Sequence, residues 1–482
     1  MREELFQQRL NETGEVGYVD EISHSLVYAN GLPGARVREV VAFETGELGQ
    51  VLSISPGKVE ISLFSRDKAT IGTKVARTDR NLQIDLNMSL LGQTISPLGL
   101  PSGSLKGKTE SRPVDVPPPG VPARRKTKSP LNTGVAIADL AVPLGRGQRE
   151  LIIGDRQTGK TSFAMQVVRT QVSQGAVCVY CLIGRRAVEV RRAEETFEKY
   201  KITGKSVIVA STSTDTAGLV FLTPYSAMTV AEYFRDQGND VVLVLDDLLS
   251  HANYHREVSL LGKRFPGRGS YPGDIFYVHA RLLERAGNFE RGSITCLPIV
   301  NTVEGDLTGY VQTNLMAITD GHIFFDSDLF NQGRRPAINA FLSVTRIGSQ
   351  AQSPLMKDLS RELGKYLVEL RDARQFLHFG AEISENLKRT LDAGDRVDLL
   401  FEQSADRIVP INLSAALLTS VWAGLWSSTS VEDMRVSVPK ILNSYFRNNS
   451  YKKGIDDVTG SKSTTAELID VLKNNPNIIF LK

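Results

Sequence analysis

The stretch Leu151-Ile-Ile-Gly-Asp-Arg-Gln-Thr-Gly-Lys-Thr-Ser162 decides the fold. Residues 154–161 fit the pattern G-x-x-x-x-G-K-[ST], with an apolar strand expected at Leu151–Ile153 and a helix expected over Ser162–Gln171. In that context the pattern is a phosphate-binding P-loop. Glycines let backbone N–H groups surround phosphate oxygens, and the start of the helix adds a positive dipole. The stretch therefore predicts a P-loop α/β domain that binds the phosphates of a nucleotide.

Each residue of this loop is a predicted nucleotide contact: Gly154, Asp155, Arg156, Gln157, Thr158, Gly159, Lys160, Thr161 and Ser162. Lys160 is expected to reach the β- and γ-phosphates, and the Thr161 hydroxyl is expected to ligate Mg²⁺. The apolar run Val241–Leu245 is followed by Asp246 and Asp247. This is the form of the strand that completes a magnesium site, and Asp246 is the expected second metal residue, acting through water.

A residue that activates water is missing where one is expected. Hydrolysis needs a group that orients the attacking water, usually Glu or Gln at the end of a neighbouring strand. The strand expected at Val177–Ile183 is instead followed by Gly184, Arg185 and Arg186, and Glu189 is the only nearby carboxylate. Arg185 can hold phosphate but cannot act as a base. The pattern favours nucleotide binding without efficient turnover.

Around the P-loop the pattern indicates three domains. Apolar runs alternate with helical stretches from Gly134 to about Gln350, as in a parallel α/β sheet, and we assign residues 81–350 to a nucleotide-binding α/β domain. Residues 1–80 hold short β-prone pieces cut by glycines, which indicates a small β-barrel. These pieces are Val16–Val27, Val37–Phe43, Val51–Ile54 and Val59–Phe64. Residues 351–482 show helical spacing and are assigned to a helical bundle.

The basic, proline-rich stretch Ser102–Pro130 is expected to be a solvated linker. The longest uncharged stretch lies between Arg407 and Glu432, but Pro410 and several polar residues favour a buried core helix over a membrane span. The pair His251 and His255 has the spacing of zinc ligands without a third ligand, so a helix surface is expected there.

Composition excludes several classes of protein. The 482 residues are 41% hydrophobic, with 57 Lys and Arg against 54 Asp and Glu. This balance argues against a dedicated nucleic-acid binder. Cys178 and Cys181 lie three apart in an expected buried strand, where their thiols face opposite sides and cannot share a metal. Three cysteines in such a chain indicate a reducing compartment, and no targeting segment is seen at the N-terminus.

From about Gly14 to residue 440 the chain resembles the alpha subunits of F-type ATP synthases. The stretch Gly145–Thr161 carries the likeness, and its Gln157 is typical of alpha rather than of the catalytic beta subunit. Further matching motifs are Glu232-Tyr-Phe-Arg-Asp236, Pro272-Gly-Asp-Ile-Phe-Tyr277, Arg281-Leu-Leu-Glu-Arg285, Ile318-Thr-Asp-Gly321 and Pro336-Ala-Ile-Asn339. The segment Ser343-Val-Thr-Arg346 resembles the family signature near the subunit interface.

The resemblance implies a β-barrel, a RecA-like domain and a helical domain in a chain that keeps its nucleotide without turning it over. It implies that Arg346, with Ser343 beside it, acts in trans as an arginine finger at the active site of beta. Arg335, Pro336 and Gln403 match residues near the adenine. Where catalytic subunits carry Glu and alpha subunits commonly carry Gln, this chain has Arg185.

The implied partners are beta subunits, alternating with alpha in a hexamer, the gamma subunit of the central stalk, and the delta subunit of the peripheral stalk. Contact with the membrane would come only through the ion-translocating sector, at the cytoplasmic face of the cell membrane. One alternative is a self-sufficient homohexameric RecA-like ATPase of the secretion or RNA-translocase type. That motor needs an arginine finger and a water-activating carboxylate in one chain. A second alternative is a paralogue in a repurposed or sodium-driven rotary complex.

Overall fold

The computed structural model describes residues 2–65, 69–378 and 385–480. These residues form two compact units, each built from several segments of the chain. The first unit comprises Met1–Arg125, Gly175–Asn301 and Asp306–Thr319, and the second comprises Lys126–Gln174, Thr302–Gly305 and Asp320–Lys482. The three-domain boundaries expected from the sequence remain a prediction.

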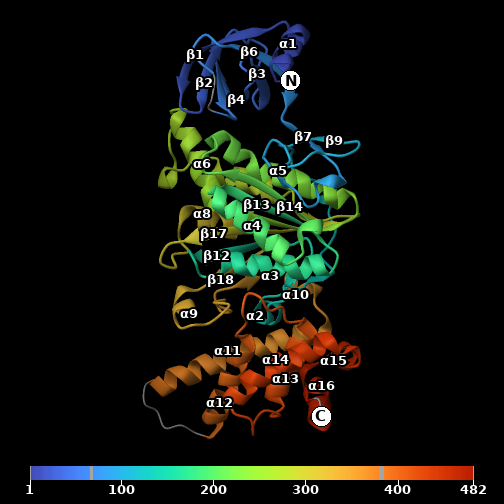
Figure 1. Cartoon of the computed structure of the whole chain (residues 1–482). Coiled ribbons are helices and arrows are strands. Elements are labelled where there is room, and N and C mark those ends of the chain that lie inside the picture. The colour runs from blue at the N-terminus through green and yellow to red at the C-terminus, as the bar shows by residue number, and fades with distance from the viewer. Residues whose placement is uncertain (1, 66–68, 379–384, 481–482) are drawn as a thin grey trace. The chain divides into compact units, whose positions relative to one another are not determined.

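The first unit begins with the predicted barrel. Six strands close into a barrel in the order β1-β2-β5-β4-β3-β6 (Figure 1). The barrel core includes Val27, Val41 and Ile61. The strands are β1 (Val16–Ser23), β2 (Leu26–Asn30), β3 (Glu39–Phe43), β4 (Leu48–Ser55), β5 (Lys58–Leu63) and β6 (Lys74–Asn81), and helix α1 (Arg2–Thr13) packs on β6 and β3.

Two details of the barrel differ from the expectation. The piece Val16–Val27 is two strands rather than one, because the chain reverses at His24, whose φ is +56°. Strand β6 was not expected, since its sequence Lys-Val-Ala-Arg-Thr-Asp-Arg-Asn is mostly polar. Its apolar residues Val75 and Ala76 are nevertheless fully buried.

The rest of the first unit contains a parallel sheet in the order β17-β15-β13-β14-β8. These strands are β17 (Ser293–Thr302), β15 (Asp240–Asp246), β13 (Val177–Arg185), β14 (Ser206–Thr212) and β8 (Thr94–Ile95). Helices α4 (Ala187–Lys199), α5 (Ala217–Asp236) and α6 (Leu248–Leu261) pack against β13. Cys178, Cys181 and Cys296 are buried within these strands, and none of the three forms a disulfide. The predicted buried strands are confirmed.

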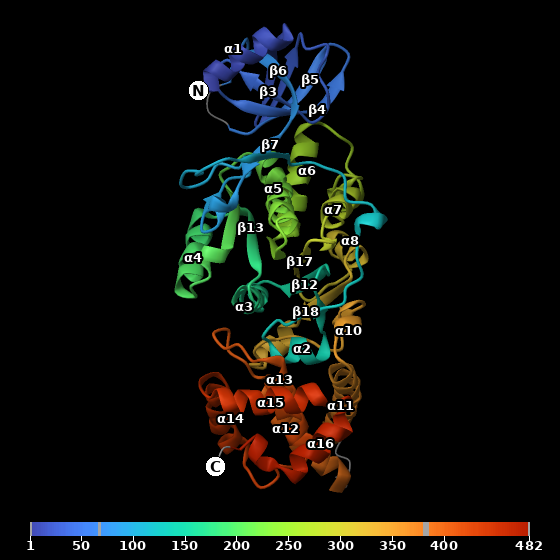
Figure 2. The same cartoon turned by 90° about the vertical axis from the view of Figure 1, so that its right-hand side faces the viewer.

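The second unit holds the P-loop strand β12 (Glu150–Asp155), which pairs in parallel with β18 (Gly321–Phe325), and β19 (Val344–Thr345), which pairs antiparallel with β18. Helix α3 (Lys160–Ser173) follows the P-loop. The predicted C-terminal helical region is confirmed (Figure 2). It contains α11 (Pro354–His378), α12 (Glu385–Phe401), α13 (Ile411–Trp422), α14 (Val431–Arg447), α15 (Asn449–Ser461) and α16 (Thr465–Asn474).

The uncharged stretch after Arg407 forms the predicted core helix, because residues Leu413–Val421 of α13 are all buried. Across the part of the chain that the structure describes, no helix combines the length and apolar character needed to cross a membrane.

The linker expected at Ser102–Pro130 is only partly solvated. Its strand β9 (Glu110–Pro113) pairs with β7 (Gln83–Leu86). Arg124 lies over the Phe289 ring and donates to the carbonyl oxygens of Glu284 and Ala286. Arg124 therefore departs from the expected solvated linker, because backbone acceptors outside the linker bind it.

The expectation of a helix surface at His251 and His255 was also wrong. Both rings are buried on α6 and lie against the Phe221 ring, with centroids 4.9 and 5.0 Å away. His251 Nδ1 is 3.1 Å from His279 Nε2, and His255 Nε2 is 2.9 Å from a carboxylate oxygen of Asp274. No group of three or more His, Cys, Asp or Glu residues within the described ranges is arranged to hold a metal. These histidines therefore serve the core of the first unit.

This histidine cluster predicts a loss of stability in acid. Burial lowers the pKa of His279 to about 3, with a smaller contribution from His255, and burial lowers that of His251 well below its ordinary value. Below a pH of about 6.5 the unfolded chain binds a proton at such a histidine and the folded chain does not. The unfolding free energy therefore falls by about 1.4 kcal/mol per pH unit for each proton until the pH nears 3. We expect His279→Gln to reduce the slope of unfolding free energy between pH 6 and 4 by about this amount.

Denaturant unfolding followed by circular dichroism at several pH values measures that slope. His24 is exposed, so His24→Gln is the matched control and should leave the slope unchanged. Equal slopes for the His279→Gln variant and the unsubstituted chain would contradict the prediction.

Candidate functional site

The P-loop connects β12 to α3, and its glycines are required by its shape. A side chain at Gly154 would place its Cβ 2.2 Å from the carbonyl oxygen of Phe325 on β18, so only glycine lets the loop lie this close. Gly159, the residue before α3, has φ of +105°, a conformation that favours glycine. The first N–H groups of a helix have no partner within it. In α3 they lie at the loop, where an anion can bind them.

Lys160 is held inside the loop. Its ammonium donates hydrogen bonds to the carbonyl oxygens of Gly154, at 2.8 Å, and of Asp155, and the side chain is buried. Thr158 Oγ1 closes the loop by donating to the Asp155 carbonyl at 2.8 Å. The lysine ammonium therefore lies on the inner side of the loop, bound to backbone carbonyl oxygens of the loop. Arg156, Gln157, Thr161 and Ser162 are exposed around the loop.

The Asp155 carboxylate fastens the loop to two other segments. It accepts hydrogen bonds from Thr302 Oγ1 at 2.5 Å, from the Gly305 amide at 2.9 and 3.0 Å, and from Ser327 Oγ at 2.6 Å. Burial alone would raise the pKa of Asp155, but these hydrogen bonds and the nearby Lys160 charge outweigh it and lower the pKa. Asp155 is thus a carboxylate that positions the loop. Sequence reasoning missed its three partners, because nothing in their spacing links them to residue 155.

A second part of the candidate site follows α9 (Ser327–Asn331), which contributes Ser327. The Arg335 guanidinium lies 3.4 Å from the centroid of the Phe330 ring and donates to the Phe330 carbonyl at 2.7 Å. Arg335 is exposed and Pro336 is partly exposed. These two residues form the surface that the resemblance assigns to the adenine.

Gln403 lies behind that surface and is buried. Its backbone N–H donates to the Arg335 carbonyl at 2.6 Å. Its side chain accepts from Ala136 N at 3.0 Å and donates to Gly134 O and Arg407 O, each at 2.7 Å. Gln403 therefore holds the Arg335 backbone in place.

Arg346 lies on an exposed edge of the second unit. It follows β19, and its backbone N–H donates to the Asp320 carbonyl at 3.1 Å. Within the described residues its guanidinium makes no hydrogen bond or ion pair, which leaves the positive charge open to solvent or to a neighbouring chain. Ser343 Oγ donates to the Asn339 carbonyl at 2.7 Å and accepts from the Phe324 N–H at 2.9 Å. Ser343 therefore fixes the segment that presents Arg346.

The remaining predicted residues belong to the first unit, at the carboxyl ends of β13 and β15. The Arg185 guanidinium pairs with the Asp246 carboxylate and, at 3.0 Å, with that of Asp247. Tyr180 Oη donates to Asp246 at 3.3 Å, and Asn301 Nδ2 donates to Asp247 at 2.9 Å. Both carboxylates are buried and already have donors.

The pairing of Arg185 with Asp246 and Asp247 shifts the pKa values in this cluster. Burial alone would lower the pKa of Arg185, but Asp246 and Asp247 outweigh it and raise the pKa. Burial raises the pKa of Asp246 even with Arg185 beside it. Glu189, the nearby carboxylate that the sequence offered as a base, accepts from the Arg186 N–H at 3.0 Å and caps α4.

The two predicted metal residues, Thr161 and Asp246, differ in how well they suit Mg²⁺. The Thr161 hydroxyl is exposed in the first turn of α3 and is the kind of oxygen ligand that Mg²⁺ takes together with phosphates and water. The charge of Asp246 is balanced by Arg185, so its carboxylate offers a second cation less attraction than an unpaired one would.

The fold and the P-loop define a nucleotide-binding protein with a parallel α/β sheet, a small barrel and a C-terminal helical region. Comparison with protein families gives the same class. The nucleotide-binding domain of the ATP synthase alpha/beta family matches residues 134–345, and the C-terminal domain of the ATP synthase alpha/beta chain matches residues 352–476. The chain belongs to the ATP synthase alpha/beta family.

Individual relatives narrow this assignment to the alpha subunits. The chain is 37% identical over 470 residues to ATP synthase subunit alpha of Caldanaerobacter subterraneus, covering 96% of this chain and 92% of that one. It is 37% identical to the same subunit of Neorickettsia sennetsu, over 89% and 88% of the two chains, and 38% identical to that of Dictyoglomus turgidum, over 89% and 85%. The resemblance seen in the sequence is confirmed.

Proposed function

We infer that this alpha subunit binds ATP or ADP without efficient turnover, and that it supplies Arg346 to the active site of an adjacent beta subunit in a rotary F-type ATP synthase. The observation that carries the first part is Arg185. At the position where catalytic subunits have a glutamate, the chain has a guanidinium paired with Asp246 and Asp247. A guanidinium stays protonated and cannot accept a proton from water.

The second unit supplies the groups that would bind the nucleotide. Backbone N–H groups of the loop and the start of α3 would surround the phosphates, and Lys160 would balance their charge. Thr161 would hold Mg²⁺ directly, and the motif assigns Asp246 a contact through water. Bound Mg²⁺ neutralises phosphate charge. Arg335 and Pro336 would border the adenine, held from behind by Gln403.

The exposed guanidinium of Arg346 supports the second part of the proposal. An arginine finger must reach the transferring phosphoryl group of a neighbouring chain, and a residue already engaged in an ion pair would first have to break it. In this arrangement beta subunits alternate with alpha around the gamma subunit, with the delta subunit as a peripheral-stalk partner. The chain would lie at the cytoplasmic face of the membrane and meet it only through the ion-translocating sector.

The homohexameric motor considered above is a weaker candidate. It needs a carboxylate that activates water within the same chain, and Glu189 is engaged at the start of α4. Hydrolysis by this chain alone would favour that motor, so turnover separates the two functions.

The nucleotide site itself is tested by Lys160→Ala. We expect the dissociation constant for ATP to rise about 10- to 100-fold, because charge-assisted hydrogen bonds contribute about 1.5–3 kcal/mol. Equilibrium dialysis or calorimetry on the purified chain measures it. Lys473 is exposed on α16, so Lys473→Ala removes the same charge elsewhere and should leave the affinity unchanged. ATP affinity that is equal in the Lys160→Ala variant and the unsubstituted chain would refute the site.

A further inference from the structure

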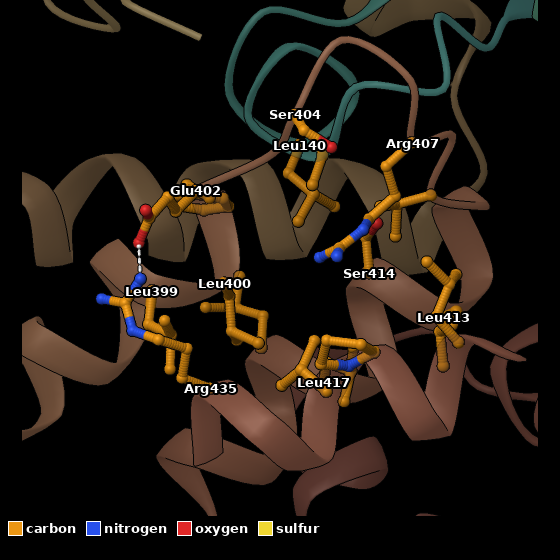
Figure 3. Close-up of a pocket in the computed structure, with 17 residues that line it drawn as sticks. Leu140, Leu399, Leu400, Glu402, Ser404, Arg407, Leu413, Ser414, Leu417 and Arg435 are labelled. Carbon is orange, nitrogen blue, oxygen red and sulfur yellow. Dashed lines mark hydrogen bonds and ion pairs between the residues drawn. The ribbon is translucent and has the colours of Figure 1, made fainter. Parts of the chain in front are cut away.

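A cavity of about 220 Å³ lies in the second unit, away from the P-loop. It is bordered by α12, α13, α14 and the short helix α2 (Ala136–Ala141), and by the loop between α12 and α13. Most of its lining is apolar and includes Leu140, Leu399, Leu413 and Leu417 (Figure 3). The proposed function assigns this cavity no role.

The charged side chains of the lining have a net charge of +1. They are Glu402, Arg407 and Arg435. Arg435 Nη1 lies 2.8 Å from Glu402 Oε2, so these two neutralise each other. The Arg407 guanidinium has no hydrogen bond or ion pair with any described residue, and Figure 3 shows it turned toward the leucines of the lining. An apolar cavity with one unpaired guanidinium is complementary to an apolar molecule that carries a single anionic group.

The backbone that carries Arg407 is held in place from outside the cavity. Its carbonyl accepts hydrogen bonds from Gln403 Nε2 at 2.7 Å and from Gln166 Nε2 of α3 at 3.0 Å. Its N–H donates to the Ser404 carbonyl at 3.0 Å. The guanidinium therefore projects from an ordered loop, so less entropy is lost when it binds a ligand.

We propose that this cavity binds a small monocarboxylate with an apolar tail, whose carboxylate pairs with Arg407 and whose tail packs on the leucines. A guanidinium matches the two oxygens of a carboxylate with parallel hydrogen bonds. Burial of the tail adds about 25 cal/mol per Å² of apolar surface.

The volume of the cavity limits the length of the ligand's apolar tail. The cavity is larger than the ~150 Å³ engineered cavity that holds benzene and smaller than the ~300–1,000 Å³ of pockets for drug-sized ligands. Medium-chain fatty acids and substituted benzoates fall between these limits. The proposal does not depend on the nucleotide site.

Calorimetric titration of the full chain with sodium octanoate tests the proposal, with 1-octanol as the neutral ligand of equal tail length. We expect saturable binding of one octanoate per chain and weaker binding of 1-octanol. Arg407→Gln should weaken octanoate binding about 10- to 100-fold, as for the loss of a charge-assisted hydrogen bond, and should leave 1-octanol binding unchanged. Arg447, exposed at the end of α14, is outside the lining, and Arg447→Gln should change neither affinity.

A second variant guards against loss of fold. Val438 is a partly exposed residue of the lining, and Val438→Phe should fill the cavity and weaken both ligands while the thermal midpoint is kept. The Lys160→Ala variant should bind octanoate as the unsubstituted chain does, which separates this site from the nucleotide site. Absence of saturable octanoate binding, or equal octanoate affinity in folded Arg407→Gln, would overturn the proposal.

Discussion

Replacement of Arg346 by alanine is expected to lower ATP hydrolysis by the assembled complex by a factor of about 10³ or more. A guanidinium that stabilises charge on the transferring phosphoryl group contributes roughly 10³ to 10⁵ in rate when a neighbouring chain supplies it. Arg346 is exposed and its guanidinium has no ion pair in the described chain, so the substitution breaks no side-chain hydrogen bond or ion pair of the fold. The loss should therefore fall on the rate and not on assembly.

The measurement compares complexes reconstituted from this chain with its beta and gamma partners. Size-exclusion chromatography establishes that the variant assembles, and a coupled assay gives the rate. Arg346→Lys keeps the charge but loses the planar fork and should recover only part of the rate. Thr345→Ser, beside it, is the neutral control. If assembled Arg346→Ala complexes hydrolyse ATP at the full rate, Arg346 is not the arginine finger.

The second large effect is expected in the core of the first unit, at Arg285. Its side chain is fully buried and forms two parallel hydrogen bonds with the Glu232 carboxylate, at 3.0 and 2.6 Å. It also donates to the Val114 carbonyl and to Thr229 Oγ1, each at 2.8 Å. We expect Arg285→Met to lower the unfolding free energy by about 3–5 kcal/mol, because Glu232 is left buried without its partner.

The double variant Glu232→Leu with Arg285→Met distinguishes an unpaired charge from lost packing. Replacing both partners of a buried pair with apolar residues is often neutral or stabilising, so the double variant should recover most of the loss. Arg389 and Glu385 form an exposed pair on α12, and Arg389→Met should change stability by less than about 1 kcal/mol. Denaturant unfolding followed by circular dichroism gives all three values. A double variant as unstable as Arg285→Met would show that packing, not charge, dominates.

Patterns with short-range causes could be predicted from the sequence. The P-loop, the apolar parallel strands and the helical spacing in residues 351–482 each depend on residue spacing within one element, and each is confirmed. Polar strand β6 was missed because Val75 and Ala76 are its only apolar residues, and they lie on opposite faces of the strand. The polarity of His251 and His255 suggested a surface, but Phe221 and His279 bury them.

Within the candidate site, the residues of the phosphate-binding motif could be read from the sequence, and the residues that support them could not. Asp155 was assigned to the nucleotide from the motif alone, and the bonds of its carboxylate to Thr302, Gly305 and Ser327 could not be foreseen. Gln403 was placed near the adenine, and its contacts show how it would act there, by holding the backbone of Arg335. Such partners lie tens to hundreds of residues apart in the chain, and only the fold brings them together.

The central claim is that this chain binds ATP and does not hydrolyse it efficiently by itself. The direct test loads the purified chain with ATP labelled at the γ-phosphate and follows the release of labelled phosphate without any partner subunit. We expect the nucleotide to stay bound as intact ATP, with release no faster than in Lys160→Ala controls. Steady release that disappears in Lys160→Ala would mean that this chain activates water by itself, and would contradict the account.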